Sequence, residues 1–176
     1  MAASALLFAF PGSPTIYYGD EAGVTGFTDP DNRRTYPWGH EDQEMIAYHK
    51  ELIRLRHSCP EMQFGSVRAV AMEDGFLAYG RFTKKIASLI VINLNSYTVT
   101  KDFDLRRLGI PYTCTMQRLL ISTAEGFRTD VLDRHVTDGT LTLLAPPTSA
   151  ILVRYDRYQP VSKEEFWKRN FLHFDR

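Results

Sequence analysis

The residues best suited to chemistry in this sequence lie in one short stretch, residues 29–34 (DPDNRR). Sugar hydroxyls are neutral groups that both donate and accept. A carboxylate that accepts from two of them, beside a guanidinium that donates to their oxygens, therefore forms a preorganised clamp. This stretch offers both groups, since Asp29 and Asp31 carry carboxylates and two arginines follow, Arg33 and Arg34. Pro30 restricts the backbone within it. The alternative interpretation is an ion pair on a solvated loop, which contributes at most about 1 kcal/mol.

The histidines and cysteines show no arrangement typical of catalysis or metal binding. No histidine has a neighbouring nucleophile or a second ligand at a usual spacing: His40, His49, His57, His135 and His173. Cys59 and Cys114 are far apart and outside any C-x-x-C pattern, which predicts buried thiols rather than a disulfide framework or a zinc site. The sequence therefore predicts neither a metal site nor a cofactor.

Five aromatic residues in or beside the same region could stack on sugar rings: Tyr17, Tyr18, Phe27, Tyr36 and Trp38. We expect Tyr17 and Tyr18 to belong to a buried strand, which makes a core position the better interpretation for both. We expect Trp38 to pack beneath the loop.

The composition is that of a folded domain without a charged binding surface. The chain has 176 residues, 21 Lys and Arg against 21 Asp and Glu, and 44% hydrophobic residues. A chain of this length buries roughly 70% of the surface that its unfolded form exposes, which argues against disorder. Balanced charge without runs of like charge predicts that neither nucleic acid nor an anionic membrane is a partner.

The elements that position residues 29–34 begin with an apolar run, residues 2–10 (AASALLFAF). The run is shorter than the roughly 20 residues that cross a bilayer, and it lacks the cationic start of a signal peptide. We interpret it as the last turns of a buried helix whose beginning lies in sequence outside this chain. The PGSP turn that follows leads into residues 15–18, whose β-branched and aromatic composition predicts a short strand buried on both faces.

A long loop, residues 19–40, connects this expected strand to a helix. The loop is rich in glycine, proline and charge, and loops longer than about 15 residues in compact domains are usually functional. Apolar residues then recur at helical spacing over residues 41–58, with acidic residues in the first turn and basic residues in the last. The apolar stripe contains Met45, Tyr48, Leu52 and Leu55.

Short strands dominate the rest of the chain. The pattern predicts strands over residues 67–72, 76–82, 86–94, 97–103, 112–121, 140–144 and 149–155. Turn signals such as Asp74-Gly75 separate them, and their regular spacing predicts an antiparallel β-sandwich with Greek-key links. Residues 162–174 begin like a capping box and predict an amphipathic C-terminal helix.

Residues 11–26 (PGSPTIYYGDEAGVTG) and 29–38 (DPDNRRTYPW) resemble the eighth strand and following loop of the α-amylase superfamily of glycoside hydrolases. The resemblance is closest to the neopullulanase, cyclomaltodextrinase and maltogenic amylase branch. The order of expected elements also agrees over about residues 1–156: last barrel strand, substrate loop, last barrel helix and β-sandwich. The resemblance implies that Asp29 and Arg33 hold a glucose unit on the non-reducing side of the cleaved bond.

The resemblance also implies what this chain lacks. Retaining chemistry at α-glucosidic bonds needs two carboxyl groups about 5 to 5.5 Å apart, and in this superfamily the catalytic acids precede the PGSP turn. We therefore expect no catalytic residue in the chain. Asp20 and Glu21 would point to opposite sides of a continuing strand, so they are poorly placed for that role.

The expected fold has three parts. Residues 1–58 would be the terminal β/α portion of an incomplete (β/α)8 barrel, since a whole barrel takes about 250 residues. Residues 59–156 would form the antiparallel Greek-key β-sandwich, and residues 157–176 a helical tail. The exposed barrel portion predicts self-association, disorder of the first 58 residues, or their repacking against the sandwich or the tail.

Two classes of function remain open. One is a C-terminal segment of an α-glucan hydrolase or transglycosylase that binds an α-glucan or maltooligosaccharide but is inactive alone. A related activity, such as that of a 1,6-glucosidase, stays open within this class. The other is a noncatalytic module that binds glycan or a partner. The sequence does not define the compartment, with the cytoplasm slightly favoured.

Overall fold

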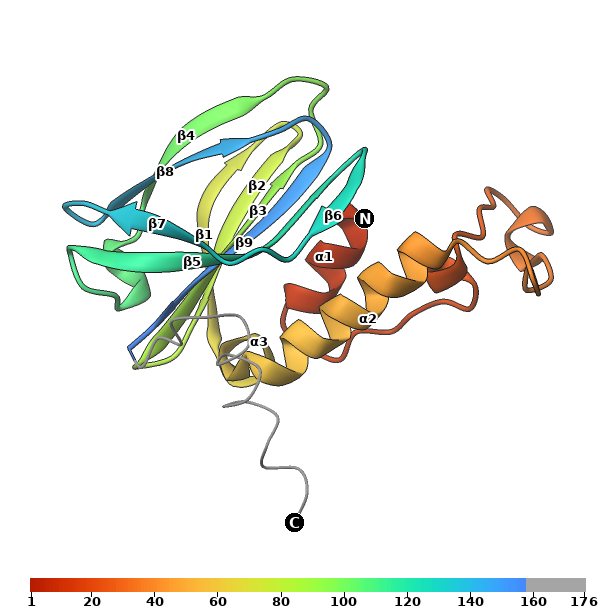
Figure 1. The fold of residues 1–176 in the computed structure, drawn as a ribbon, viewed down its shortest axis with the longest axis horizontal. Helices are drawn as coiled ribbons and strands as arrows, with labels where there is room; N and C mark the ends of the chain where they lie inside the picture. The colour runs from red at the N-terminus through yellow and green to blue at the C-terminus, as the bar shows by residue number, and fades with distance from the viewer. Residues whose placement is uncertain (158–176) are drawn as a thin grey trace, which may run out of the picture.

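The computed structural model describes residues 1–157 and consists mainly of antiparallel β-sheet, covered on one side by helices (Figure 1). The α-helices are α1 (Ala2–Ala9), α2 (Gln43–Ser58) and α3 (Pro60–Phe64). Three 3-10 turns are η1 (Asp20–Ala22), η2 (Asp31–Arg33) and η3 (Arg106–Leu108). The strands are β1 (Ser66–Glu73), β2 (Phe76–Phe82), β3 (Ile86–Asn93), β4 (Val99–Asp104), β5 (Cys114–Thr123), β6 (Gly126–Arg128), β7 (Leu132–Val136), β8 (Thr140–Ala145) and β9 (Ser149–Asp156).

The strands form two sheets. The large sheet has the order β1-β2-β3-β9-β5-β6, with β7 also paired to β5, and the small sheet pairs β4 with β8. All of these pairings are antiparallel. The last strand, β9, lies between β3 and β5, so strands distant in sequence become neighbours at the centre of the sheet. The predicted antiparallel sandwich is thereby confirmed.

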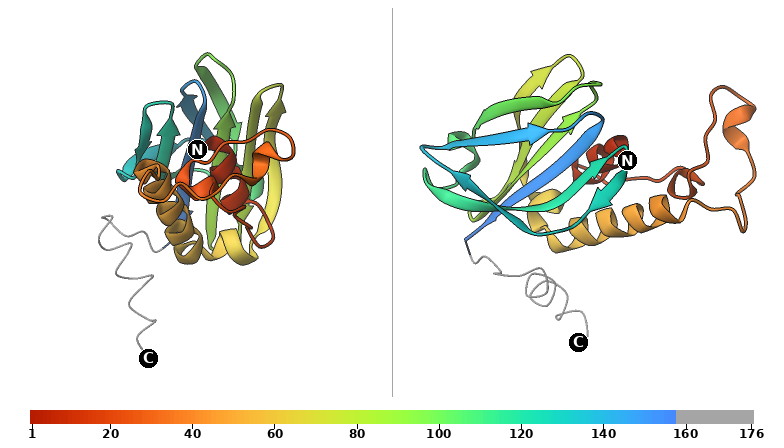
Figure 2. Two further views of the ribbon diagram at one scale, coloured as in Figure 1. Left: turned by 90° about the vertical axis from the view of Figure 1, so that its right-hand side faces the viewer. Right: turned by 45° about the horizontal axis from the view of Figure 1, so that its top comes forward.

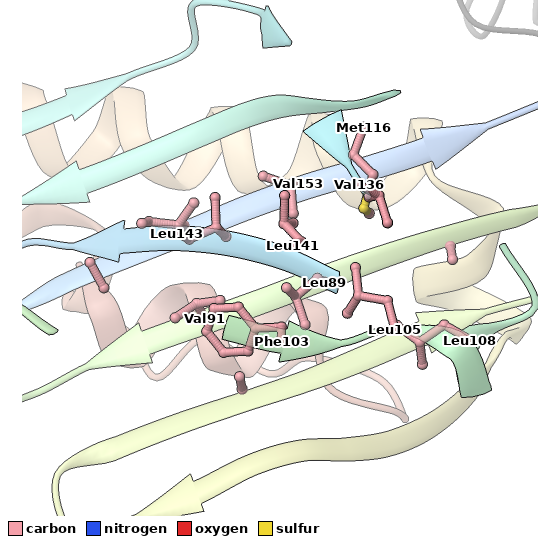
Figure 3. Close-up of a cluster of buried hydrophobic side chains, with 14 of the residues drawn as sticks. Leu89, Val91, Phe103, Leu105, Leu108, Met116, Val136, Leu141, Leu143 and Val153 are labelled. Carbon is pink, nitrogen blue, oxygen red and sulfur yellow. The ribbon is translucent and has the colours of Figure 1, made fainter. Parts of the chain in front are cut away.

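One hydrophobic core fills the space between the two sheets (Figure 3). Leu89 and Val91 of β3 pack there with Phe103 of β4 and with Leu141 and Leu143 of β8. Alternate residues of each strand point to one face of a sheet, which is why these side chains are spaced two apart. In β8, accordingly, buried and exposed residues alternate.

A second core lies on the opposite face of the large sheet, beneath the helices (Figures 1 and 2). Phe8 of α1 and Leu52 of α2 pack with Ile90 and Ile92 of β3 and with Leu152 of β9. Because helices cover one face and the small sheet covers the other, β3 and β9 are buried on both faces. Burial on both faces explains the nearly continuous apolar run of β3, a pattern otherwise typical of parallel sheets.

Helix α2 agrees with its sequence prediction. Asp42 caps it by accepting a hydrogen bond from the Met45 N–H at 2.9 Å, and Tyr48, Leu52 and Leu55 of the predicted stripe are buried. The helix ends at Ser58, but Pro60 then opens the further short helix α3, which the sequence analysis did not predict. Proline is favoured at a first helical position because the missing N–H has no intrahelical partner there.

The predicted strand over residues 15–18 is wrong. The structure has no strand there, and Tyr17 and Tyr18 are 51% and 47% exposed. A strand needs a neighbour to complete its backbone hydrogen bonds, and the described residues place none beside this segment. The analysis also missed β6 and β7, which are short and carry few apolar residues. The predicted C-terminal helix lies outside the described residues.

A buried ion pair fixes the helical segment to the sandwich. Glu61 of α3 accepts hydrogen bonds from Arg154 Nε of β9 at 2.8 Å and from Ser88 Oγ of β3 at 2.6 Å. The side chains of Glu61 and Arg154 are 0% and 3% exposed. Packing of the first 58 residues against the sandwich was one of the expected outcomes. Helices α1 and α2 do pack there, whereas most of the segment between them projects away from the sandwich (Figures 1 and 2).

Candidate functional site

The candidate site lies on the segment between α1 and α2, which projects away from the sandwich beyond the start of α2 (Figures 1 and 2). The base of this loop is closed by the Asp42 N–H, which donates to the Ala22 carbonyl at 3.0 Å. Gly23 adopts a φ of 78°, and a Cβ there would lie 2.9 Å from the Asp42 side chain. The loop therefore leaves and rejoins the body of the protein at one point.

The chain entering the loop is held by two arginines. Arg56 of α2 donates to the Phe8 carbonyl at 2.6 Å and to the Gly12 carbonyl, and Arg81 of β2 donates to the Ala9 carbonyl at 2.7 Å. The bonds to Phe8 and Ala9 satisfy carbonyls at the end of α1 that have no intrahelical donor. The sandwich and α2 thus set the position from which the PGSP turn starts.

Asp29 and Arg33 are brought together by the 3-10 turn η2. Arg33 Nη2 lies 2.8 Å from Asp29 Oδ2 and Arg33 Nε lies 2.7 Å from Asp29 Oδ1, a two-point pairing of the kind that planar guanidinium favours. The side chains remain 67% and 58% exposed, Arg33 and Asp29 respectively. Both can therefore reach a ligand in solvent without first leaving a buried position.

The turn itself depends on a glycine. A Cβ at Gly26 would lie 2.7 Å from the Asp31 carbonyl oxygen and from Asn32 Cα, closer than real Cβ atoms come to backbone. A second pair, which sequence reasoning missed, follows in the same turn: Arg34 Nε and Nη2 lie 2.8 and 2.5 Å from Asp31 Oδ1. The spacing of three residues between Asp31 and Arg34 was the signal that could have revealed it.

The aromatic residues of the loop are exposed rather than packed. Trp38 is 80% exposed, so the expectation that it packs beneath the loop is wrong. Its ring centroid lies 4.6 Å from that of Tyr36, while the Tyr17 and Tyr18 centroids are 4.8 Å apart. Partial desolvation, with the nearby charges of Glu21 and Glu41, raises the pKa of Tyr36. The loop therefore presents aromatic surface beside its two ion pairs.

The acidic residues near the loop base have local roles. Asp20 begins η1 and Glu21 Oε2 accepts from the Gly19 N–H at 3.1 Å, so neither extends from a strand as the sequence analysis expected. Backbone N–H groups of Glu41 and Gly39 lower the pKa of the Glu41 carboxyl. Over residues 1–157 no group of three or more His, Cys, Asp or Glu side chains is arranged to hold a metal ion.

Cys59, Cys114 and His49 lie outside the loop that carries Asp29 and Arg33. Both cysteines are free; Cys59 is buried, which raises its pKa to about 12, whereas Cys114 is only partly buried. His49 is buried beneath α1, with Nδ1 2.9 Å from the Met45 carbonyl. In the part of the chain that the structure describes, no helix is long and apolar enough to span a membrane.

Comparison with solved structures identifies the class of protein that has this fold. No family model matches the chain. The fold matches an α-amylase from Anoxybacillus with a TM-score of 0.71 and 26% identity, covering 91% of this chain and 32% of that chain. The layered arrangement of helices and antiparallel sheets is therefore that of the C-terminal β-sandwich region of α-amylase family enzymes.

Proteins that are similar in sequence define this class more closely. The chain is 40% identical over 79 residues to an amylopullulanase from Thermoanaerobacter thermohydrosulfuricus, a match covering 45% of this chain and 5% of the relative. It is 31% identical over 128 residues to a maltogenic α-amylase from Bacillus acidopullulyticus, covering 68% of this chain and 22% of the relative. Neopullulanase and cyclomaltodextrinase are further homologues. The chain is thus a homologue of α-glucan-acting glycoside hydrolases and matches a C-terminal part of such proteins.

Proposed function

We propose that this chain is a C-terminal segment of a retaining α-glucan hydrolase or transglycosylase, and that it supplies substrate-binding groups without the catalytic carboxylates. The observation that carries the proposal is the exposed two-point pairing of Asp29 with Arg33, in a chain whose homologues include an amylopullulanase and a neopullulanase. The relatives are several times longer than the matched region, so activity is proposed for the whole protein and not for this segment.

Asp29 and Arg33 would bind a glucose unit by complementary hydrogen bonding. Their mutual ion pair neutralises both charges, so the ligand needs no charge of its own to bind. Each group keeps unused hydrogen-bonding capacity: the carboxylate has further acceptor positions, and the guanidinium has five N–H donors in all. Neighbouring hydroxyls of one sugar could then bond to both groups at once. An α-glucan or maltooligosaccharide is the ligand that this arrangement suits.

The test is isothermal titration calorimetry, in which maltotriose is added to the purified chain. The same mixture is then analysed for hydrolysis or transfer products. We expect binding without turnover, and we expect Asp29→Asn to weaken binding at least several-fold. Asp31→Asn is the matched control, because Asp31 also pairs with an arginine in the same turn but lies outside the proposed clamp. Turnover above the blank would contradict the proposal that this chain lacks the catalytic carboxylates. Equal binding by both variants would overturn the role of Asp29.

A noncatalytic glycan-binding or partner-binding module is the second candidate. It is favoured by the sandwich, which has a buried hydrophobic core between its two sheets. In this case maltotriose or a cyclodextrin would bind with unchanged affinity to both Asp29→Asn and Arg33→Lys. Binding lost in these two variants would instead assign the ligand to the loop.

A further inference from the structure

A pocket on the sandwich is separate from the candidate sugar-binding loop. Residues of β5, β7, β8 and β9 line it, and its volume is about 260 Å³. Its apolar wall includes Ile121, Leu144 and Ile151, and two arginines, Arg118 and Arg134, line the same pocket. Ligand sites commonly combine mostly apolar walls with a few placed polar groups. This pocket has that combination, and its polar groups are cationic.

An irregularity in β5 places Arg118 at this pocket. The register of β5 against β9 shifts between Arg118 and Leu120, so Leu119 is an extra residue in β5 and forms a β-bulge. Leu119 and Leu120 both pack in the core beneath the helices, whereas Ile121 packs between the two sheets. Arg118 and Ile121 therefore line one pocket, although residues three apart in a regular strand point to opposite faces. Bulges of this kind re-aim side chains and are frequent beside functional sites.

The second arginine lies on the same face of the sheet. Arg134 of β7 is directly opposite Met116 of β5, and Met116 packs between the two sheets. Arg118 follows Met116 by two positions, so the two arginines are diagonal neighbours across β5 and β7, roughly 7 to 8 Å apart along the backbone. Two positive charges at this separation repel each other, and an anion between them would remove the repulsion.

The hydrogen bonds of Arg118 are incomplete. Its side chain is 9% exposed; Nη2 donates to the Asp130 carboxylate, while the buried Nε has no hydrogen-bond partner among the described residues. Arg134 Nη1 donates at 2.8 Å to a neutral group, the Asp133 carbonyl. Burial lowers the pKa of the Arg118 guanidinium, and the charge of Arg134 lowers it further, against the opposite effect of Asp130. A charged acceptor from outside the chain would satisfy both arginines better than the groups around them do.

We propose that this pocket binds a small organic acid with a short aliphatic chain. The ligand carboxylate would accept hydrogen bonds from the guanidinium groups of Arg118 and Arg134, and its chain would pack against Ile121 and Leu144. An inorganic anion would leave the apolar wall in contact with water, and an uncharged alcohol would leave the two positive charges without an acceptor. No lining residue belongs to the sugar-binding loop, so the proposal does not rest on glucan binding.

The test is isothermal titration calorimetry of the full chain with hexanoate as the probe. We expect a Kd that is roughly millimolar, as is usual for a ligand of this size. Acetate has the carboxylate without the chain, and 1-hexanol has the chain without the charge. We expect each of them to bind at least several-fold more weakly than hexanoate.

Three variants locate the binding. Arg134→Gln removes a charge at a half-buried position and should weaken hexanoate binding about ten-fold, because a charge-assisted hydrogen bond is lost. Arg68→Gln is the matched control: it makes the same change in net charge at an exposed position of β1 outside the pocket, and hexanoate affinity should stay the same. Leu144→Gln, at a wall residue that is 59% exposed, should weaken hexanoate binding and leave acetate binding unchanged. Far-UV circular dichroism establishes that each variant is folded.

Four results would overturn the proposal. The first is no heat of binding with hexanoate at about 20 mM. The second is equal affinity for hexanoate and 1-hexanol, which would mean that the arginines do not contact the ligand. The third is equal affinity for hexanoate and acetate, which would make this a site for simple anions. The fourth is equal affinity of Arg134→Gln and Arg68→Gln for hexanoate, which would place the binding elsewhere on the protein.

Discussion

Replacing Glu61 by glutamine tests the contact that joins the helices to the sandwich. The Glu61 carboxylate is fully buried and accepts from Arg154 at 2.8 Å and from Ser88 at 2.6 Å. Glu61→Gln keeps the size of the side chain but removes its charge. The Arg154 guanidinium, only 3% exposed, would then retain Asp156 as its ion-pair partner, at 3.0 Å.

The expected loss of unfolding free energy follows from the burial of the Glu61–Arg154 ion pair. Removing one partner of a buried ion pair costs about 3 to 5 kcal/mol, because the remaining charge stays buried without compensation. The remaining Asp156 partner places the expected loss near the lower end, about 3 kcal/mol. For a domain of this size a loss of 1 kcal/mol lowers Tm by about 2 to 4 °C, so the expected decrease is roughly 6 to 12 °C.

Urea unfolding followed by far-UV circular dichroism measures this loss. Glu73→Gln is the matched control, since Glu73 pairs with Lys101 but is 54% exposed, and its loss should cost about 1 kcal/mol or less. A second comparison replaces both Glu61 and Arg154 by methionine. Apolar replacement of a whole buried pair is often neutral or stabilising, so the double variant should be more stable than Glu61→Gln.

The reasoning fails if Glu61→Gln unfolds within about 1 kcal/mol of the unmodified chain. That result would mean that the pair is solvated in solution, or that α3 is not held against β3 and β9. A double methionine variant less stable than Glu61→Gln would show instead that hydrogen-bond geometry, and not uncompensated charge, dominates the contact.

Alkaline pH should destabilise the protein. Burial raises the pKa of Tyr48 and of Cys59 to about 12; the folded state therefore favours their neutral forms, and this stability is complete below the unfolded values of about 10 and 8.5. The unfolding free energy should fall as pH rises from about 8 to about 11, by up to 1.4 kcal/mol per pH unit for each group. The fall should be smaller in Tyr48→Phe, which has lost one of the two groups. A urea midpoint that does not change over this pH range would contradict the prediction. The Cys59 thiol should not react with Ellman's reagent until the protein is unfolded, whereas Cys114 should react sooner, and equal native rates would refute the burial of Cys59. Gly80→Ala should cost about 1 to 3 kcal/mol in urea unfolding, because its Cβ would lie 2.4 Å from a methyl group of Leu108, which is 1% exposed.

Several local features could be read from the sequence. The period of the apolar residues predicted α2, and Asp42 supplies the side-chain cap just before its first turn. The alternating pattern and the Asp74-Gly75 turn placed β2 at residues 76–82, the bounds that the structure has. These features depend on interactions between residues close in the chain, so a short window of sequence contains the information that decides them.

The pairing of Asp29 with Arg33 belongs to the same class. Four positions separate the two residues, and η2 needs only local hydrogen bonds such as the one from the Arg33 N–H to the Pro30 carbonyl at 3.0 Å. The exposure of Trp38 could not be predicted in this way. Exposure depends on which distant segments lie over a side chain, and nothing in a loop sequence specifies those.

The sequence by itself therefore determined the class of sandwich, the helix before it and the two groups of the candidate clamp. Only the tertiary structure decided that residues 15–18 are not a strand, that helices bury the second face of β3, and that Glu61 meets Arg154 across 93 positions of the chain. The physical reason is that a strand, a buried face and a buried charge each need a partner. Those partners lie far along the chain, where no local pattern records them.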